Sequence, residues 1–524
     1  MLSILIYKSN LHCISENYLI NKFILFYSDN LKKIQLIICI ALLLFNALAV
    51  TASQKTIESN IKETTGSILI DFDPLVDIIV TFDVLAIRAL DKIDILNCPD
   101  FFVKVFINNE EFTSPVWNNS DYLYDCWSVT KNVADDIENV NLTVQLWDWN
   151  KNNNKICDIS KNNNNQDEGF EINLIYDIKT GRWYGDDYNI GDTTGYGRVC
   201  GTGDGSIYKD ENDCELWFNI HQNDYDNDGL PYWVETFVYG TDPIINNMGE
   251  DNDEDGVPIE WEHKWGFNPN IWDDHEHFDP DGDSINNIEE FLTSNFYSDP
   301  YRKDIFLEID YMEDGPKGQK SIVPEKSKEI LKNPFHRRNI VIHLDTGEAN
   351  GGEVITFDEN VKLGELLEIY NNYFLHNDEN NWRRGVFHYG IIAYYCNPTG
   401  FAFSGDVYPY YGYIPGTNGF IISSKRIETY VRISFTSLEN YYAYAIMHEM
   451  GHNFGMRWGN PFGCDSQLSK YPWQTGYWYY RNYKSIMNYR YTYKILDYSD
   501  GSHGRRDHND WANLSLSYFE FIEN

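Results

Sequence analysis

The stretch 441–456, YYAYAIMHEMGHNFGM, sets the expected fold and chemistry of the last third of the chain. His448 and His452 are four residues apart, so a helix opening near Leu438 places both imidazoles on one face, with Glu449 beside them. Two neutral imidazoles at this spacing can bind one zinc ion, while the adjacent carboxylate reaches the water on the metal. The stretch therefore predicts a catalytic zinc site in which Glu449 is the general base.

Apolar runs ahead of this helix alternate with longer polar or helical segments. Such alternation is typical of strands joined by helices, and it predicts an α/β domain over 301–524. The runs are IFLEIDY (305–311), NIVIHLD (339–345), GVFHYGIIAYY (385–395) and GFIISS (419–424).

The residues after the helix resemble those of metzincin proteases. Gly455 can end the helix in a left-handed turn that redirects the chain towards the metal. The segment SIMNY (485–489) resembles the Met-turn of that family. This resemblance, from HEMGHNFG through SIMNY, implies a zinc endopeptidase of metzincin-like α/β fold that acts on proteins or peptides.

The third zinc ligand departs from the family pattern. Metzincins place it three residues after the helix-ending glycine, and Trp458 stands there, with an indole N–H that is only a donor. Asp465 follows Gly463 in a turn-rich segment and supplies a hard oxygen, so we predict it as the replacement ligand. Tyr489 is the alternative, as in some metzincins. Trp458 itself is expected to pack as a wall of the site.

An acidic repeat occupies 222–300. Asp-x-Asp-x-Asp recurs three times, and a Glu stands at the twelfth position of each loop, which is the EF-hand ligand spacing. Only short helices fit between the loops, over 258–265 and 286–292, so the repeat resembles the single-helix calcium repeats of extracellular linkers. Ser284 replaces the sixth-position Gly of the third loop, which should be the weakest site. The predicted ligands are Asp224, Asp226, Asp228, Glu235, Asp251, Asp253, Asp255, Glu262, Asp279, Asp281, Asp283 and Glu290.

Short alternating runs over 65–221 predict an all-β sandwich, as in FFVKVFI (101–107) and LTVQLW (142–147). Acids lie where two of these strands meet loops, and oxygens gathered from two loops suit calcium. This arrangement resembles a C2 domain, with Asn150 where the family usually has Asp. The resemblance implies calcium ligands at Asp94, Asp100, Asp148, Asn150 and Asp158. It leaves open whether the module also contacts lipid.

An apolar stretch near the N-terminus, LIICIALLLFNALAV (36–50), follows two lysines and ends in small residues. We expect a signal peptide or an uncleaved signal anchor within 1–53, and both would place the chain outside the cell or on its surface. Sequons at Asn118, Asn141 and Asn513 agree with an exported glycoprotein. The later cysteines lack CxxC zinc spacing, so we expect disulfides with at least one thiol left over: Cys98, Cys126, Cys157, Cys200, Cys214, Cys396 and Cys464.

The net charge of −39 argues against nucleic acid as a partner and suits a calcium-loaded surface. Two functions fit the sequence. One is an active zinc endopeptidase with calcium-stabilised accessory domains. The other is a catalytically inactive, calcium-dependent binding or adhesion protein with a protease-like fold. Membrane contact through the anchor or the C2-like module stays open, and the sequence does not predict an oligomeric state.

Overall fold

The computed structural model describes residues 77–94, 96–134, 136–151, 153–162, 170–187, 197–209, 211–347, 351–405, 413–433 and 436–516. They belong to the second of two compact units, Asp77–Asn524. The predicted signal or anchor within 1–53 lies outside the described residues. Among the helices that are described, none is long and apolar enough to cross a membrane.

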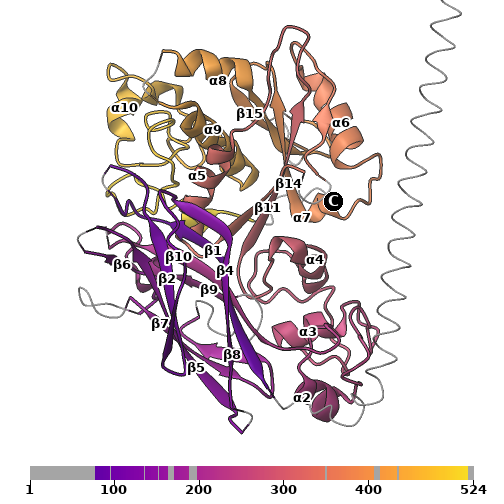
Figure 1. Ribbon diagram of the computed structural model, residues 1–524. Helices are drawn as coiled ribbons and strands as arrows, with labels where there is room; N and C mark the ends of the chain where they lie inside the picture. Colours follow the sequence, from indigo (N-terminus) through magenta and orange to yellow (C-terminus); the bar gives the residue numbers. More distant parts are fainter. Residues whose placement is uncertain are drawn as a thin grey trace, which may run out of the picture. The chain divides into compact units, whose positions relative to one another are not determined.

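The described residues form three β-sheets in more than one domain (Figure 1). Two of these sheets form a β-sandwich, which comes first in this unit. One sheet has the order β4-β1-β10-β9, and the other has the order β3-β2-β5-β7-β8, with β6 paired to β5. The strands are β1 (Ile79–Ala89), β2 (Phe101–Ile107), β3 (Glu110–Thr113), β4 (Tyr122–Asn132), β5 (Asn139–Asp148), β6 (Lys155–Cys157), β7 (Ile172–Asp177), β8 (Arg182–Gly185), β9 (Gly197–Cys200) and β10 (Cys214–Gln222).

Alternation along the strands builds the core of the sandwich. In β5 every second side chain, from Val140 to Leu146, is buried, while the intervening residues face outwards. The inner residues pack against Phe82 and Phe218 of the facing sheet, whose rings stack with centroids 5.3 Å apart.

The cysteines differ from the sequence expectation, because all seven are free thiols in the structure. Cys157 and Cys214 both lie in the sandwich core, and Cys396 and Cys464 lie in the cores of the later domain. A buried cysteine packs as a small apolar side chain, and this use accounts for most of them.

A segment of loops and short helices follows the sandwich. Its elements are α2 (Tyr232–Val234), η3 (Glu235–Tyr239), α3 (Ile259–Trp265), α4 (Asn287–Leu292) and η4 (Ser294–Phe296). Trp261 and Trp265 of α3 form a small core of their own with Val257. Asn286 caps α4 by accepting the backbone N–H of Glu289, whose side chain accepts the N–H of Asn286 in return.

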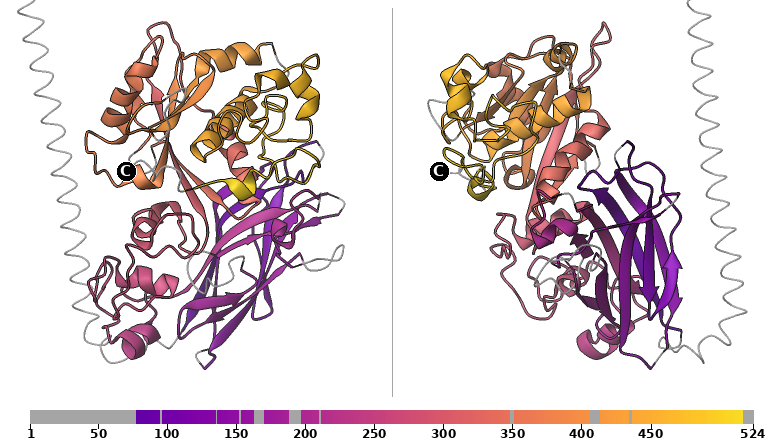
Figure 2. Two further views of the ribbon diagram at one scale, coloured as in Figure 1. Left: turned by 180° about the vertical axis from the view of Figure 1, so that it is seen from behind. Right: turned by 90° about the vertical axis from the view of Figure 1, so that its left-hand side faces the viewer.

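The last domain is a mixed sheet with helices on both faces (Figures 1 and 2). Its order is β12-β11-β14-β16-β15, in which only the edge strand β15 runs antiparallel to its neighbour, and β13 pairs in parallel with the last residues of β11. The elements are β11 (Asp304–Met312), α5 (Glu325–His336), β12 (Val341–Asp345), β13 (Val354–Ile355), η5 (Leu363–Glu365), α6 (Leu366–Ile369), η6 (Tyr370–Phe374), α7 (Arg383–Val386), β14 (Phe387–Ala393), β15 (Gly400–Ser404), β16 (Asn418–Ser423), α8 (Ser424–Val431), α9 (Leu438–Asn453), η7 (Gln467–Ser469), α10 (Thr475–Tyr479) and η8 (Trp511–Asn513).

The two faces of this sheet carry different cores. On one face Ile305, Leu307 and Ile309 of β11 pack with residues of α5 and α9. On the other face Phe306 and Met312 pack with residues of α6, η6 and α7. Figure 1 shows the two groups of helices on opposite sides of the strands. The helix with the histidines therefore lies on one face only.

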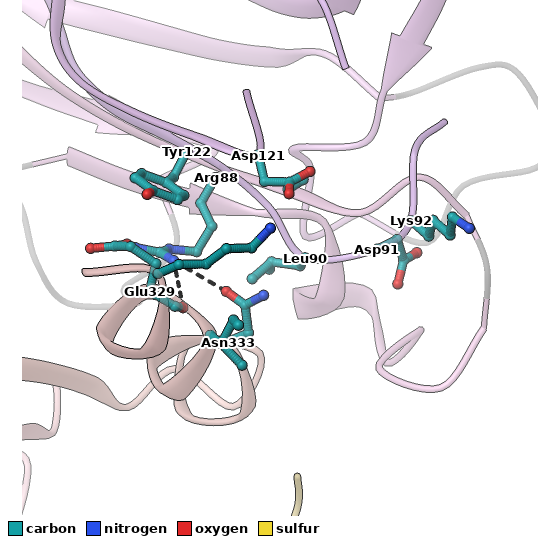
Figure 3. Close-up of a pocket in the computed structure, with 11 residues that line it drawn as sticks. Arg88, Leu90, Asp91, Lys92, Asp121, Tyr122, Glu329 and Asn333 are labelled. Carbon is teal, nitrogen blue, oxygen red and sulfur yellow. Dashed lines mark hydrogen bonds and ion pairs between the residues drawn. The ribbon is translucent and has the colours of Figure 1, made fainter. Parts of the chain in front are cut away.

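Charged side chains join the sandwich to α5. Arg88 of β1 pairs with the Glu329 carboxylate at 2.5 Å and donates to the Asn333 side chain at 3.2 Å. Figure 3 shows Arg88 reaching these residues across a pocket whose wall also includes Tyr122. A second buried link runs from Arg198 through Glu215 to His336 of α5. Both links are buried, where an unpaired charge would be costly. Each guanidinium group is paired with a carboxylate.

Candidate functional site

Helix α9 carries the predicted zinc-binding histidines. Ser437 caps its start by accepting the backbone N–H of Asn440, and Gly455, at φ +97°, turns the chain after its end. His448 and His452 are both buried, and their ring centroids are 5.1 Å apart. The i, i+4 spacing thus brings the two rings to one side of the helix.

Asp465 lies between the two imidazoles. Its Oδ1 is 3.1 Å from Nε2 of His448, and its Oδ2 is 3.2 Å from Nε2 of His452. Ligand atoms of the three residues lie within 4.8 Å of one another. The backbone of Asp465 is held in this position by a φ of +53° and by its N–H, which donates to the carbonyl of Met487 at 2.9 Å.

The outer nitrogens of both rings are fixed by backbone oxygens. Nδ1 of His448 lies 3.0 Å from the carbonyl oxygen of Ile486, and Nδ1 of His452 lies 2.6 Å from that of Met456. A carbonyl can only accept, so each Nδ1 carries the proton and each Nε2 is turned towards Asp465. Nδ1 is thus held as a donor, which leaves Nε2 as the nitrogen that would bind a metal once its own proton is lost.

The predicted Met-turn lies under the helix. An added Cβ at Gly451 would sit 2.4 Å from the sulfur of Met487, so only glycine lets this side chain approach α9 so closely. Tyr489 stacks on His448, with ring centroids 5.9 Å apart, and its side chain hydrogen-bonds to Asp465. Tyr489 therefore lies against the site as a neighbour of Asp465.

Glu449 is buried beside the histidines and faces β15. An added Cβ at Gly400 would lie 2.7 Å from Oε1 of Glu449, and the carboxylate accepts the backbone N–H of Ala402. Burial raises the pKa of Glu449 above its usual range, against the attraction of His448 and His452.

The charges of the cluster balance one another. Burial lowers the pKa of His452, but the Asp465 carboxylate outweighs it and raises the pKa to about 9. Burial alone would raise the pKa of Asp465, yet the two imidazoles hold it well below its usual range. Without a metal, the carboxylate and the imidazoles thus form a buried ion pair.

Trp458 does not form a wall of the site, contrary to the sequence expectation. Its side chain is 74% exposed. Arg457 and Asn460 exchange backbone hydrogen bonds of 2.7 and 2.8 Å, which leaves Trp458 and Gly459 at the tip of a tight turn. Side chains at such a tip point into solvent.

The three acidic loops each gather their carboxylates around one centre. Asp224, Asp226 and Asp228 form one candidate metal-binding group, and Asp255 and Glu262 form another with His275. Several buried oxygens receive no hydrogen bond from the described residues, namely both of Asp226, Asp253, Glu262 and Glu290 and Oδ2 of Asp281. Burial, followed by the neighbouring acids, raises the pKa of Glu235 to about 8 and that of Glu262 to about 9.

The backbone of all three loops follows one pattern. The N–H of the sixth residue donates to the first Asp in each, at 2.8 Å from Gly229, 3.0 Å from Gly256 and 2.9 Å from Ser284. The third loop is also joined to β11, because Asp283 accepts the backbone N–H of Asp304 at 2.7 Å. Asp283 and Glu290 are almost fully buried there.

The predicted C2-like ligands divide into two places. Asp148 accepts the N–H of Asp100 at 2.9 Å and the side-chain amide of Asn150 at 2.7 Å, and the charge of Asp94 acts on it. Asp158 lies elsewhere, because β6 pairs antiparallel with β5 and sets Lys155 opposite Asp148. Asp158 is three residues further along, roughly 10 Å away at the rise of a strand.

Other candidate groups of ligands were not predicted from the sequence, although Asp158, a member of one of them, was predicted as a ligand elsewhere. Asp158 forms a group with Asp204 and Glu211, and His503 forms one with Asp500 and Asp507. His275 joins the second loop through Asp255, at 3.2 Å. Each set brings together residues from separate turns. The sequence alone does not show how these turns lie relative to one another, so it does not predict the groups.

Comparisons with known proteins give weak similarity at the sandwich. No family model matches the chain, and no curated protein matches it. Among solved structures, a C2 domain is 13% identical, with 28% of this chain and 98% of that chain covered and a TM-score of 0.17. A C2 domain of plant Extended Synaptotagmin 1 is 14% identical, with 28% and 95% covered and a TM-score of 0.18.

Human GIVD cytosolic phospholipase A2 is similar over the same share of this chain, at 13% identity and a TM-score of 0.18. Only 16% of the phospholipase is covered. All three TM-scores are low.

Proposed function

We propose that the chain is a zinc-dependent endopeptidase whose catalytic centre is built from His448, His452, Asp465 and Glu449. The observation that carries this proposal is the convergence of two Nε2 atoms and one carboxylate, with both Nδ1 atoms fixed by backbone carbonyls. Two histidines and one carboxylate are a donor set of catalytic zinc, and ligating histidines commonly donate their other nitrogen to a carbonyl. The residues therefore fit the ion.

Zinc, when bound here, supplies a Lewis acid that activates water and polarises a peptide carbonyl. Glu449 is outside the ligand set and is held by Ala402 beside it. From there it accepts the proton of the attacking water and passes it to the leaving amine. The direction of its pKa shift, above the usual range of a carboxyl group, suits both steps, because the group then accepts a proton more readily and can pass it on.

A protein or peptide substrate agrees with the position of β15. This strand ends the sheet, and it carries Ala402, whose N–H points at Glu449 rather than at β16. An extended peptide that adds to the edge of β15 would pass the carboxylate and the two histidines. The scissile bond would then lie across the proposed metal centre.

Calcium in the three acidic loops is the second part of the proposal. The loops supply unpartnered carboxylate oxygens at the third and twelfth positions, which are calcium-ligand positions. An exported glycoprotein agrees with such sites, and Asn118, Asn141 and Asn513 are all exposed. We keep the C2-like assignment of the sandwich, with Asp94, Asp100, Asp148 and Asn150, within this proposal.

A calcium-dependent binding protein without turnover is the alternative. It is favoured by Trp458, which stands at the family position of the third ligand and lies exposed, away from the histidines. This protein would use the loops and the sandwich for adhesion.

Replacing Glu449 by Gln separates the two functions. Glu449→Gln should lower peptide hydrolysis by about 10²–10⁴-fold or more while bound zinc stays near one per chain, because a base is lost and no ligand. Glu439→Gln, at the first turn of the same helix, is the matched control and should leave the rate unchanged. Peptide cleavage and zinc content are measured on the same samples. Wild-type protein that binds zinc but cleaves no peptide would support the binding protein.

A further inference from the structure

A second acidic cluster lies on the face of the sheet opposite α9. Glu308 and Asp310 are two residues apart on β11, so both project to the same face, between Phe306 and Met312. Both are fully buried. Their surroundings are the aromatic core formed by Tyr389 and its neighbours, where an uncompensated carboxylate costs several kcal/mol.

Acidic groups outnumber basic groups in this cluster, as far as the described residues form it. Glu308, Asp310, Asp345 and Glu353 face one guanidinium, Arg383, which donates to Glu308 at 2.7 Å and to Asp345 at 2.6 Å. His376 approaches only the exposed side of the cluster, 3.2 Å from Glu353 Oε1.

Two carboxylate oxygens in the cluster receive no hydrogen bond from the described residues. They are Oε1 of Glu308, whose side chain is 0% exposed, and Oε2 of Glu353. The Glu353 carboxyl lies within hydrogen-bonding reach of Asp310, and its backbone N–H donates to Asp310 Oδ1 at 2.7 Å. Tyr389 holds the other oxygen of Asp310 at 2.6 Å. The side chain of Glu353, which carries one of the unpartnered oxygens, thus contacts a carboxylate that is fixed by two donors.

The position of the cluster in the sheet also points to a ligand. The chain passes from β11 to β12 on one side and later returns to β14 on the other side of β11. Ligands of open α/β sheets bind at such a reversal, outside the carboxyl ends of the strands. Glu308 is the central residue of β11, Asp310 lies in its carboxyl half, and Asp345 is the last residue of β12.

We propose that Glu308, Asp310 and Glu353 bind one divalent, oxygen-seeking cation, with calcium as the ion that occupies the site. Carboxylates from two segments supply the hard ligands that calcium takes, and Arg383 balances the remaining charge of Asp345 and Glu308. The site is separate from the three acidic loops and from the histidines of α9. It ties the segment around Glu353 to the central strand.

The test counts calcium in the full chain. Wild type, Asp310→Asn, Glu353→Gln and the exposed control Glu359→Gln are equilibrated in calcium, gel-filtered, and analysed by atomic emission. We expect Asp310→Asn and Glu353→Gln each to bind one calcium ion fewer per chain than wild type and Glu359→Gln. Glu353 is partly exposed, so Glu353→Gln keeps the test valid if Asp310→Asn does not fold. Crystals soaked in Mn²⁺ should show an anomalous peak among the three carboxylates.

An unchanged calcium count in Glu353→Gln, together with no anomalous peak, would overturn the proposal. The acids would then hold protons, and Glu353→Gln should stabilise the protein equally with and without calcium. A count that falls by one ion when tenfold magnesium is added to wild type and Glu359→Gln, but does not fall in Glu353→Gln, would keep the site and identify magnesium as its ion. None of these results depends on peptide hydrolysis.

Discussion

The histidine cluster of α9 and the acidic loops at 222–300 are both buried groups of candidate metal ligands, but their charges are arranged in opposite ways. Asp465 lies between two imidazoles, which hold its pKa well below the usual range. Glu262 lies among other acids, and burial and those acids raise its pKa to about 9. The histidine cluster contains both acidic and basic groups, whereas the second acidic loop gathers mainly acids.

This difference separates a preformed site from an ion-dependent one. The backbone carbonyls of Ile486 and Met456 orient the histidines whether or not a metal is present. In the loops the oxygens of Asp253 and Glu262 have no donor among the described residues, so we expect a cation to supply these interactions. We therefore expect calcium to determine stability and zinc to determine activity.

Removing calcium should have the largest effect. Chelation should lower the melting temperature and increase hydrogen exchange within 222–300, because the carboxylates repel one another without a cation. Each site contributes about 2.7 kcal/mol at a calcium concentration of 100 Kd, so three sites contribute several kcal/mol. Calorimetry with calcium and with chelator measures the shift in melting temperature. Glu262→Gln should lose part of the shift, and Glu276→Gln, an exposed acid outside the loops, should keep it.

Identical melting curves with and without calcium would contradict the ion-dependent interpretation of the loops. The same experiment examines α9. Hydrogen exchange of Leu438–Asn453 should change little on chelation, because the histidine cluster needs no calcium.

Replacing the proposed third ligand should have the next largest effect. Asp465→Ala removes one of three protein ligands and should weaken zinc binding by at least about 10-fold to 100-fold, with activity falling in parallel. Zinc affinity is measured by competition with a chelator of known affinity. Trp458→Ala is the matched control, since this exposed residue occupies the family position yet lies in a solvent-facing turn. If both variants bind zinc as wild type does, Tyr489 becomes the candidate ligand.

Local patterns predicted most of the elements that carry these sites. The helix over Leu438–Asn453 was expected from the spacing of His448 and His452, and Ser437 caps its start. The strands β11, β12, β14 and β16 fall within the four apolar runs, apart from one or two residues at their ends. Asp465 was a candidate because Gly463 indicated a turn, and turns bring residues back to a helix end.

Features that depend on distant segments were not predictable in this way. The separation of Asp158 from Asp148 follows from the register of β6 on β5, which no local pattern fixes. Glu308 and Asp310 read as ordinary residues of a strand, and only the return of Glu353 makes them a cluster. The exposure of Trp458 depends on a turn closed by Arg457 and Asn460.

The smallest expected effect concerns the third loop. It tests whether the backbone conformation of the sixth residue or the burial of the acids determines the calcium affinity of a loop. Ser284 has a φ of +79°, where the first two loops have glycines at +88° and +104°. A side chain in this conformation costs roughly 1 kcal/mol relative to glycine. Since Ser284 makes the same hydrogen bond to the first Asp as both glycines, the cost is conformational alone. Ser284→Gly should therefore raise the calcium affinity of the third loop by no more than about fivefold.

Gly256→Ser, the reverse change in the second loop, should lower the calcium affinity of that loop by at least as large a factor. The reason is that an added Cβ at Gly256 would lie 3.2 Å from the side chain of Ile288. Calorimetric calcium titration of the full chain resolves both variants. If Ser284→Gly leaves every affinity unchanged while Gly256→Ser weakens the second loop, the burial of Asp283 and Glu290 against β11 outweighs the backbone at the third site. In that case the contact with the neighbouring domain, rather than the residue at the sixth position, sets the strength of the loop.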